Sequence, residues 1–507
     1  MTAFSPLPLG RKIPDRLHAV SCSLPTLRDV RGYEEKQPET MSRMCSGYPR
    51  FVVHSLTVRL GEVLAARSGV HEGRLWLACS ERVAQALVAY LGAGQARPFS
   101  AEGVHGVVHA DNPDLAARAK SFLQHTGGFL SSRQAEDVLV RLGERPKVEP
   151  EEAFAGDARA EAWRHLGPLF PGAESPHAHF ANSGINAVYA AFKAVDSAQA
   201  ARGRNLWIQL GWLYLDTIAI LKKFTRPEGS CIVVRHVDDR AELERIFAEH
   251  GPRIAGLIAE VPTNPLIQTP DVAFVSDLAR RHGARVILDP SVASAYAVDL
   301  LRHADVVVTS LTKFSAHEGD VIAGLAVVNP ASPDAAALQA GLEALIEPPY
   351  GRDLARLAAQ LPSAPEATRR IQENVTRVAA FLESRPEVSA VHWSGAARTR
   401  AAYAAVARGA GCPAGMLSFE LRVPMQAFFD AVRLPKGPSF GMRHTLLCPF
   451  IWLAHYDLVN SEAGRAELAA SGINPDLMRL APGTESADDI LAALAEALEI
   501  ASGRRRA

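Results

Sequence analysis

Four side chains that follow apolar segments could together bind an aldehyde cofactor. Lys313 comes just after the β-branched run at residues 306–308, with the hydroxyls of Ser310 and Thr312 beside it. Asp289 ends an earlier apolar run. A lysine can bond covalently to an aldehyde, hydroxyls can bind a phosphate, and a carboxylate can keep a pyridine nitrogen protonated, so that the ring accepts electrons. The pattern predicts pyridoxal 5'-phosphate (PLP) as a cofactor.

Each of these residues also has an ordinary structural explanation. A lysine after a strand is usually a solvated loop charge, an aspartate there usually caps a helix, and paired hydroxyls usually serve turns. Single motif matches are often false positives. The order of the residues, on successive strand ends, favours the cofactor site.

A second phosphate-binding feature precedes these strands. Ser183, Gly184 and Ile185 stand at the start of a predicted helix. A glycine at a helix start exposes backbone N–H groups at the positive end of the helix dipole, which favours a phosphate. An ordinary capped helix is the alternative explanation.

Residues from about 205 to 330 alternate short apolar runs with helical patterns, which predicts parallel βαβ units. Asp271 can cap one of the helices, and Gly283 can end it. The predicted fold class is therefore α/β, with a mostly parallel, doubly wound sheet. The predicted strands cover residues 206–209, 231–234, 254–259, 285–288, 306–308 and 323–328.

Ligands of such sheets bind beyond the carboxyl ends of the strands. The polar residues that follow the predicted strands should therefore share one crevice. They are Asn264, Asp289, Ser310, Thr312 and Lys313.

The chain divides into three predicted parts: residues 1–170, residues 171–345 and residues 346–507. A polar segment rich in proline and glutamate at 144–158 marks the first break, and Pro348 and Pro349 mark the second. The first part contains a strand-like segment at 75–79 and a helix-like segment at 81–91, so it should be folded. The last part contains a strand-like segment at 416–421 and a final amphipathic helix.

Composition excludes several classes of function. The chain has 507 residues, a net charge of -1 and 48% hydrophobic residues, without a basic stripe for nucleic acid. No segment is long and apolar enough to predict a membrane span, and no secretory signal is recognisable. The six cysteines are scattered, which argues against a metal site or a disulfide framework and favours the cytoplasm.

Several ordered motifs resemble those of the PLP-dependent Cys/Met metabolism enzymes, from about residue 180 to the C-terminus. They are EVPTNP at 260–265, LDPSVAS at 288–294, SLTK at 310–313 and RLAPGTE at 479–485. HAVSCSLPT at 18–26, GYEE at 32–35 and GYPRF at 47–51 are similar to the longer fungal-type cystathionine γ-synthases. The resemblance implies an aspartate-aminotransferase-like fold (fold type I), with a smaller α+β C-terminal domain and an extended N-terminal portion.

The resemblance also implies roles for individual residues. Lys313 would carry the cofactor and transfer protons, and Asp289 would pair with the pyridinium. Arg479 would bind the substrate carboxylate, with Ser439 near the lysine. Asn264 would bind the ring's phenolic oxygen, and the phosphate would lie against Ser183, Gly184, Ile185, Ser310 and Thr312. No metal is expected.

Two features concern the edge of the site. Tyr48 and Arg50 resemble a Tyr-x-Arg pair that a neighbouring subunit lends to the phosphate, which implies a homodimer or homotetramer with shared active sites. Arg133 is an alternative phosphate ligand. Leu210 stands where the family generally has an aromatic ring on the cofactor, and either Trp212 or Tyr214 could replace that ring.

The expected activity is γ-replacement on an O-activated homoserine by a thiol such as cysteine, with small amino acids as substrates. A γ- or β-lyase on the same scaffold, or γ-substitution with another nucleophile, is the alternative. A non-catalytic PLP-binding relative is a hypothesis of a different class.

Overall fold

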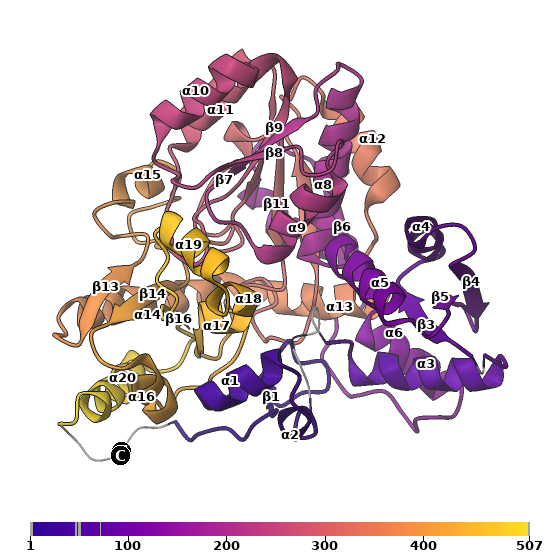
Figure 1. Ribbon diagram of the computed structural model, residues 1–507, viewed down its shortest axis with the longest axis horizontal. Helices are drawn as coiled ribbons and strands as arrows, with labels where there is room; N and C mark the ends of the chain where they lie inside the picture. Colours follow the sequence, from indigo (N-terminus) through magenta and orange to yellow (C-terminus); the bar gives the residue numbers. More distant parts are fainter. Residues whose placement is uncertain (1–3, 46–47, 49–51, 71, 505–507) are drawn as a thin grey trace.

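The computed structural model describes residues 4–45, 48, 52–70 and 72–504. Its centre is a seven-stranded sheet (Figure 1). The six strands predicted from the apolar runs are all present, within one or two residues of their expected bounds. In spatial order the strands are β6 (Ala178–Ala181), β12 (Gly324–Val328), β11 (Val306–Ser310), β10 (Arg285–Asp289), β9 (Ile254–Glu260), β7 (Leu206–Leu210) and β8 (Cys231–Val234).

The sheet is mostly parallel, as predicted. Strands β8, β7, β9, β10 and β11 run parallel, and β12 is antiparallel to both of its neighbours. Most of the side chains of the central strands are buried, because helices cover both faces. One face packs against α8 (Gly184–Ala200), α9 (Leu215–Phe224) and α12 (Ala335–Leu345); the other packs against α10 (Arg240–His250) and α11 (Val272–Arg281).

Helix α11 shows how local sequence fixes these elements. Asp271 accepts a hydrogen bond from the Phe274 N–H, so it is the predicted cap. Gly283 has a φ of +71° just beyond the helix, a left-handed conformation that glycine adopts without strain. The chain can therefore turn directly into β10 and deliver Asp289 to its carboxyl end.

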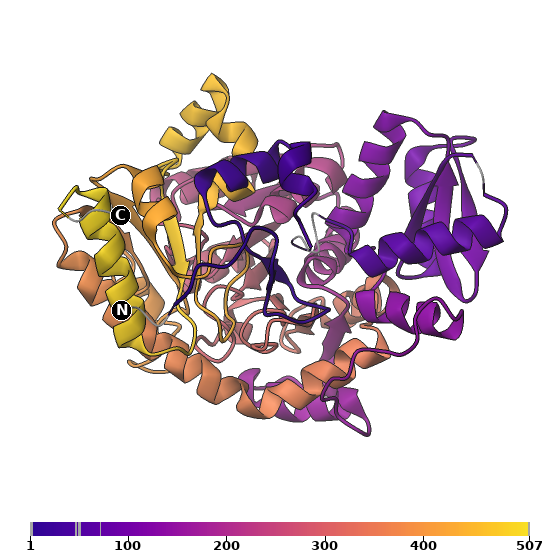
Figure 2. The same ribbon diagram turned by 90° about the horizontal axis from the view of Figure 1, so that it is seen from below.

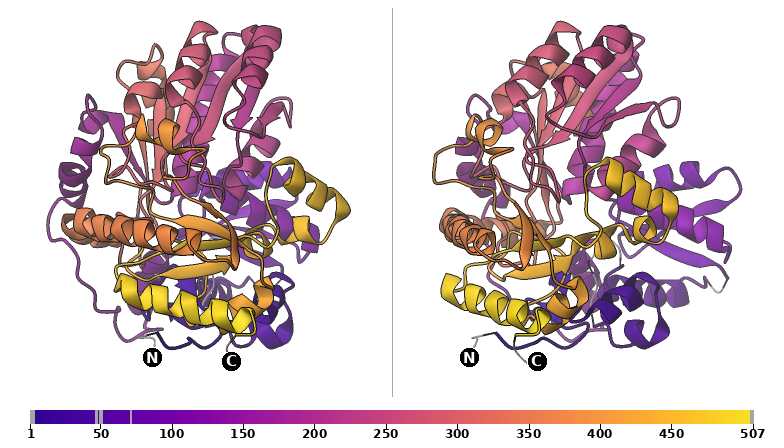
Figure 3. Two further views of the ribbon diagram at one scale, coloured as in Figure 1. Left: turned by 90° about the vertical axis from the view of Figure 1, so that its left-hand side faces the viewer. Right: turned by 60° about the vertical axis from the view of Figure 1, so that its left-hand side comes forward.

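The C-terminal part forms a four-stranded antiparallel sheet beneath the large one (Figure 3). Its order is β13 (Val388–His392), β14 (Leu417–Leu421), β16 (Met478–Ala481) and β15 (Leu446–Pro449). Strand β14 confirms the strand-like segment at 416–421, and α20 confirms the final helix. The surrounding helices are α13 (Gly351–Gln360), α14 (Ala364–Glu383), α15 (Arg400–Ala404), α16 (Met425–Ala431), α17 (Phe450–Ala454), α18 (Tyr456–Val459), α19 (Glu462–Ala470) and α20 (Ala487–Ala501).

The described residues before 142 lie in two places (Figure 2). Residues 4–45 run along the C-terminal part, where the Leu27 N–H donates to Asp430 at 2.8 Å and the Lys436 ammonium donates to the Pro25 carbonyl at 2.7 Å. They contain β1 (Lys12–Ile13), β2 (Ser21–Cys22), α1 (Leu27–Glu34) and α2 (Pro38–Met41).

The other place is a lobe with its own three-stranded sheet and two apolar clusters. It consists of α3 (Ser55–Arg67), β3 (Arg74–Ala78), α4 (Glu81–Leu91), β4 (Ala96–Ala101), β5 (Val104–His109), α5 (Pro113–Thr126) and α6 (Ser132–Arg141). Residues 144–157 then connect to α7 (Ala158–Leu166) without a helix or strand. The domain boundaries at 170 and 345 stay predictions. No helix in the described part of the chain is apolar over a bilayer-spanning length.

Candidate active site

One cavity at the carboxyl ends of the central strands gathers the residues singled out in the sequence. Every predicted site residue that the structure describes lines it; Arg50 lies outside the described residues. They are Tyr48, Ser183, Gly184, Ile185, Asn264, Asp289, Ser310, Thr312, Lys313, Ser439 and Arg479. The parallel strands therefore bring together side chains that are far apart in the sequence.

Lys313 lines this cavity, and its side chain is buried. It donates to the Ser439 hydroxyl at 2.7 Å and to the Tyr48 hydroxyl at 3.0 Å. The ring centroid of Phe440 is 4.9 Å from the same nitrogen. These contacts fix the direction of a long side chain that would otherwise have many rotamers.

The backbone around this lysine is also constrained. Phe314 and Ser439 have φ angles of +53° and +83°, which are unusual for residues with a side chain. The Phe314 N–H donates to the Gly441 carbonyl at 2.7 Å, so the lysine loop and the 438–441 loop are fastened together. Left-handed residues of this kind cost about 1–3 kcal/mol each and are common at functional sites. Here they aim Ser439 at Lys313.

Arg479 comes from β16, in the C-terminal sheet. Its guanidinium donates to the Ser439 carbonyl at 3.0 Å. It also lies 5.4 Å from the ring of Phe440 and 4.6 Å from that of Phe450. The described contacts of this group include no carboxylate, so its charge is available for an anionic ligand.

The start of α8 forms a close-fitting cradle against the end of β11. A Cβ built on Gly184 would lie 2.7 Å from Cβ of Ser310, so only glycine allows this approach. The Ser183 hydroxyl caps the helix by accepting from the Asn186 N–H at 3.3 Å. Thr312 lines the same region, although its hydroxyl already bonds the Ala323 backbone in both directions. Backbone N–H groups at this helix start would provide most of the contacts for a phosphate.

Two carboxyl groups lie side by side at the base of the cavity. Asp289 and Glu260 are paired in register on β10 and β9, and both side chains line the cavity. Burial raises the pKa of both carboxyls, and the nearby Asp289 raises that of Glu260 further. A cationic pyridinium here would relieve this cost, because it would favour the ionised form of Asp289.

Asn264 completes the ring-binding surface. It is buried beside the carboxyl pair, and its amide oxygen has no hydrogen-bond partner among the described residues. A buried polar atom without a partner is costly unless a ligand satisfies it. The lysine, the carboxylate, the amide and the helix start therefore fit the aldehyde, the pyridine nitrogen, the ring substituent and the phosphate of PLP.

The structure shows which aromatic residue near Leu210 reaches the cavity. Leu210 is buried outside the cavity lining, and Trp212 turns away to donate to His455 at 3.3 Å. Burial lowers the pKa of His455 to about 4, so its ring is neutral and accepts this bond. Tyr214 lines the cavity, and its backbone N–H donates to Glu260. Of these two candidate aromatic residues, Tyr214 is therefore the one that lines the cavity.

Tyr48 lines the cavity of its own chain in this structure, and the sharing of this residue between subunits stays a prediction. The Tyr48 hydroxyl contacts Lys313 of its own chain. Residues 4–45, which precede Tyr48, run along the C-terminal part (Figure 2).

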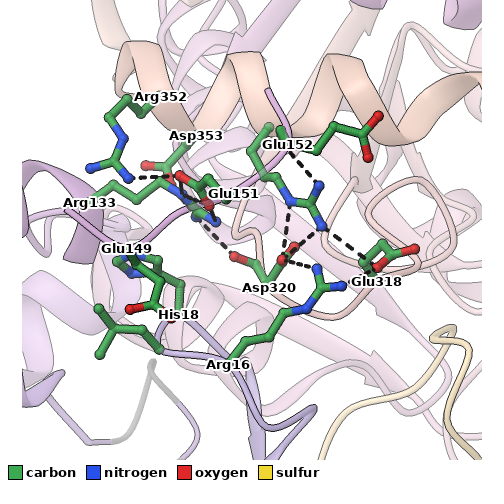
Figure 4. Close-up of polar contacts among 12 residues, drawn as sticks. Arg16, His18, Arg133, Glu149, Glu151, Glu152, Glu318, Asp320, Arg352 and Asp353 are labelled. Carbon is green, nitrogen blue, oxygen red and sulfur yellow. Dashed lines mark hydrogen bonds and ion pairs between the residues drawn. The ribbon is translucent and has the colours of Figure 1, made fainter. Parts of the chain in front are cut away.

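Arg133 is not directed at the cofactor cradle. Its guanidinium is buried and bonds Glu151 at 2.6 Å, Asp353 at 2.8 Å and the Asp320 carbonyl at 2.9 Å (Figure 4). The Asp320 carboxylate in turn pairs with Arg16 and Arg356. This network joins the lysine loop to α6, to α13 and to the N-terminal segment, so its role is to support the loop.

We expect the Arg133→Ala substitution to lower the free energy of unfolding by about 3–5 kcal/mol, because it leaves the buried Asp353 carboxylate without its cation, whereas Glu151 keeps its ion pair with Arg352. Chemical denaturation followed by tryptophan fluorescence measures the effect. The matched control is Arg369→Ala on α14, where the exposed guanidinium pairs only with exposed carboxylates, and no measurable change is expected. Equal stability of both variants would contradict the assignment.

Several cavity residues were not predicted. Val20, Glu34, Phe450 and Leu453 line it from segments that are distant in sequence from the strand ends. The GYEE motif at 32–35 was a signal for Glu34, but nothing in its spacing showed that α1 would lie over the cavity.

Among the described residues, no group of three or more side chains is arranged to bind a metal ion.

Comparisons with known proteins show a similar family of enzymes. Residues 173–499 match the model of a family described as Cys/Met metabolism PLP-dependent enzyme. The chain is 39% identical to the L-2-amino-4-chloropent-4-enoate dechlorinase/desaturase of Streptantibioticus cattleyicolor, over 98% of this chain and 99% of that protein. It is 26% identical to the cystathionine gamma-synthase of Neurospora crassa, over 98% and 99% of the two chains.

A solved structure shares the fold. It is a cystathionine gamma synthase from Xanthomonas oryzae pv. oryzae in complex with cystathionine, with a TM-score of 0.58 and 25% identity. The match covers 69% of this chain and 87% of that one.

Proposed function

Because the chain belongs to the Cys/Met metabolism PLP-dependent enzymes, we propose that it expels a stable anion from the γ-carbon of an L-α-amino acid. The first candidate is elimination of chloride from an unsaturated γ-chloro amino acid. The observation that carries the proposal is the arrangement around Ser439. Its hydroxyl accepts from the Lys313 amine at 2.7 Å, and its carbonyl accepts from the Arg479 guanidinium at 3.0 Å. A base and a carboxylate anchor thus flank one rigid residue.

PLP, once bound, supplies an electron sink that stabilises negative charge on the substrate's α-carbon. Lys313 binds the cofactor and then removes the protons from the α- and β-carbons. Arg479 binds the substrate carboxylate in the two-pronged geometry that a guanidinium favours. Asp289 keeps the ring nitrogen protonated, and Asn264 orients the ring. The phosphate is bound by the start of α8 (Ser183, Gly184 and Ile185), with Ser310 and Thr312 beside it.

The surroundings of the leaving group favour an anion that needs no added proton. Apolar side chains such as Val20, Ile322 and Leu453 line part of the cavity. Chloride and carboxylate leave as weak bases, whereas a thiolate benefits from protonation. This supports chloride or an acyloxy group as the leaving group over sulfur.

The elimination can be tested with the holoenzyme and L-2-amino-4-chloropent-4-enoate, the compound in the name of the 39% identical relative. One C–Cl bond and one C–H bond break, a carbon–carbon π bond forms, and no oxidant is needed. We expect one chloride ion per substrate consumed, with a product lighter by the mass of HCl. A stable substrate with no chloride released would refute this assignment.

The second candidate is γ-replacement on an O-acylhomoserine with cysteine. The N-terminal motifs and the full-length similarity to the Neurospora crassa cystathionine gamma-synthase favour it. Cystathionine as the product would establish replacement; 2-oxobutanoate and ammonia alone would establish a lyase. If the cofactor binds and none of these substrates reacts, the non-catalytic hypothesis is supported.

Assembly and location stay predictions. A homodimer or homotetramer remains expected, and light scattering of the holoenzyme measures it. Arg50 remains the predicted phosphate ligand from the N-terminal segment. A cytoplasmic location is expected from the unpaired cysteines.

A further inference from the structure

We infer that Glu34 restricts the enzyme to amino acids whose γ-substituent carries no negative charge. This rests on the proposed reaction at the γ-carbon and specifies its substrate class. The described charged groups that line the cavity are three carboxyls and two cations. The carboxyls are Glu34, Glu260 and Asp289, and the cations are Lys313 and Arg479.

Both cations are already used by the reaction. Arg479 pairs with the α-carboxylate of the substrate, and the Lys313 amine is the group that reacts. The described cavity lining therefore has no further cation for a second carboxylate at the far end of a substrate. The carboxyl pair of Glu260 and Asp289 would serve the ring nitrogen of the cofactor. Among the described charged groups of the cavity lining, Glu34 is therefore the one left to act on the γ-substituent.

Helix α1 holds Glu34 firmly in this place. Its N-terminus is closed by a capping box between Thr26 and Asp29, and the Leu27 N–H is tied to Asp430. The helix packs against α17, whose Phe450 also lines the cavity. Glu34 is the last residue of this helix, so its carboxyl is positioned by a rigid element and not by a loop.

The other charges near Glu34 do not offset it inside the cavity. Lys36 donates to the Tyr33 carbonyl at 2.8 Å and lies over the Tyr33 ring at 4.3 Å. Lys120 of α5 lowers the pKa of the Glu34 carboxyl, and Asp457 of α18 raises it. None of these three residues lines the cavity.

The charge on Glu34 should change within the working range of the enzyme. Burial raises the pKa of this carboxyl to about 7; Lys36 and Lys120 oppose the shift, and Asp457 adds to it. The group is therefore mostly ionised above this value and mostly neutral below it. Exclusion of anionic substituents should be strong in mildly alkaline solution and weak in mildly acidic solution.

Two unreactive ligands test the inference without turnover. L-2-aminohexanoate and L-2-aminoadipate have carbon chains of the same length. The first ends in a neutral methyl group, and the second ends in a carboxylate. Calorimetric titration of the holoenzyme should show that the neutral ligand binds more tightly. In the Glu34→Gln variant this preference should fall about tenfold, because a like-charge contact has been removed. The same loss should follow when the wild type is moved from about pH 8.5 to about pH 6.

The matched control is Glu39→Gln on α2, which removes the same charge from an exposed residue near α1 that does not line the cavity. Its preference should equal that of the wild type. An unchanged preference in Glu34→Gln, or the same fall in Glu39→Gln, would overturn the inference. Failure of the neutral ligand to bind would overturn it as well.

Turnover separates this inference from the proposed function. O-acetylhomoserine and O-succinylhomoserine differ in the charge of the leaving group, and the wild type should favour the acetyl ester. If no γ-substituted amino acid reacts while the binding preference still depends on Glu34, the proposed reaction is wrong and the charge selection stands. If the two esters react equally in the wild type and in the Glu34→Gln variant, the charge selection is wrong and the proposed reaction stands.

Discussion

Replacement of Lys313 by alanine is expected to reduce turnover by about 10⁴-fold or more, because one amine both binds the cofactor and transfers protons. Lys313→Arg should be equally inactive, since a guanidinium keeps the positive charge but neither forms the bond to the aldehyde nor accepts a proton. Chloride release from the γ-chloro substrate measures both variants.

The control for this experiment is Lys147→Ala, in the exposed connection between α6 and α7. Its turnover should match that of the wild type. A Lys313→Arg variant with activity within tenfold of the wild type would show that the lysine contributes only charge, which contradicts the proposed chemistry.

The second large effect is expected at Arg479. Arg479→Lys keeps the charge but loses the planar fork that matches a carboxylate. The loss of transition-state stabilisation, calculated from kcat/KM, should therefore be about 2–5 kcal/mol. Most of the loss should appear in KM, because the group binds the substrate at a distance from the reacting carbons. Steady-state kinetics over a range of substrate concentrations separates the two parameters.

Arg377→Lys on α14 is the matched control, since that arginine is exposed and pairs with Asp488 at the surface. It should leave both kinetic parameters unchanged. An Arg479→Lys variant that lowers kcat alone, with an unchanged KM, would assign this arginine to the chemical step and not to substrate binding.

Much of the fold and site could be predicted from the sequence, because the physics that fixes them is local. Runs of buried β-branched residues mark the central strands, and polar residues directly after them must meet at one edge of a parallel sheet. Lys313, Asp289 and Asn264 were found in this way. Strand β6 was missed because its four residues, Ala178–Ala181, carry no strand signal beyond their burial.

The remainder depended on contacts between distant segments. Tyr48 reaches Lys313 only because residues 4–45 cross the C-terminal part, and a helical pattern cannot show which surface α1 covers. For the same reason Glu34 was not predicted in the cavity. Arg133 fitted a phosphate by its chemistry, but the buried carboxylates of Glu151 and Asp353 determine its position. Only the packing distinguishes Tyr214 from Trp212 as the ring that faces the cavity.

The central claim is that the amine of Lys313 binds the cofactor covalently. Treatment of the holoenzyme with borohydride, followed by proteolysis and mass spectrometry, tests it most directly, because reduction makes the bond permanent. We predict one pyridoxyl group per chain, on the peptide that contains Lys313. A pyridoxyl group on any other lysine, or on none, would contradict the account.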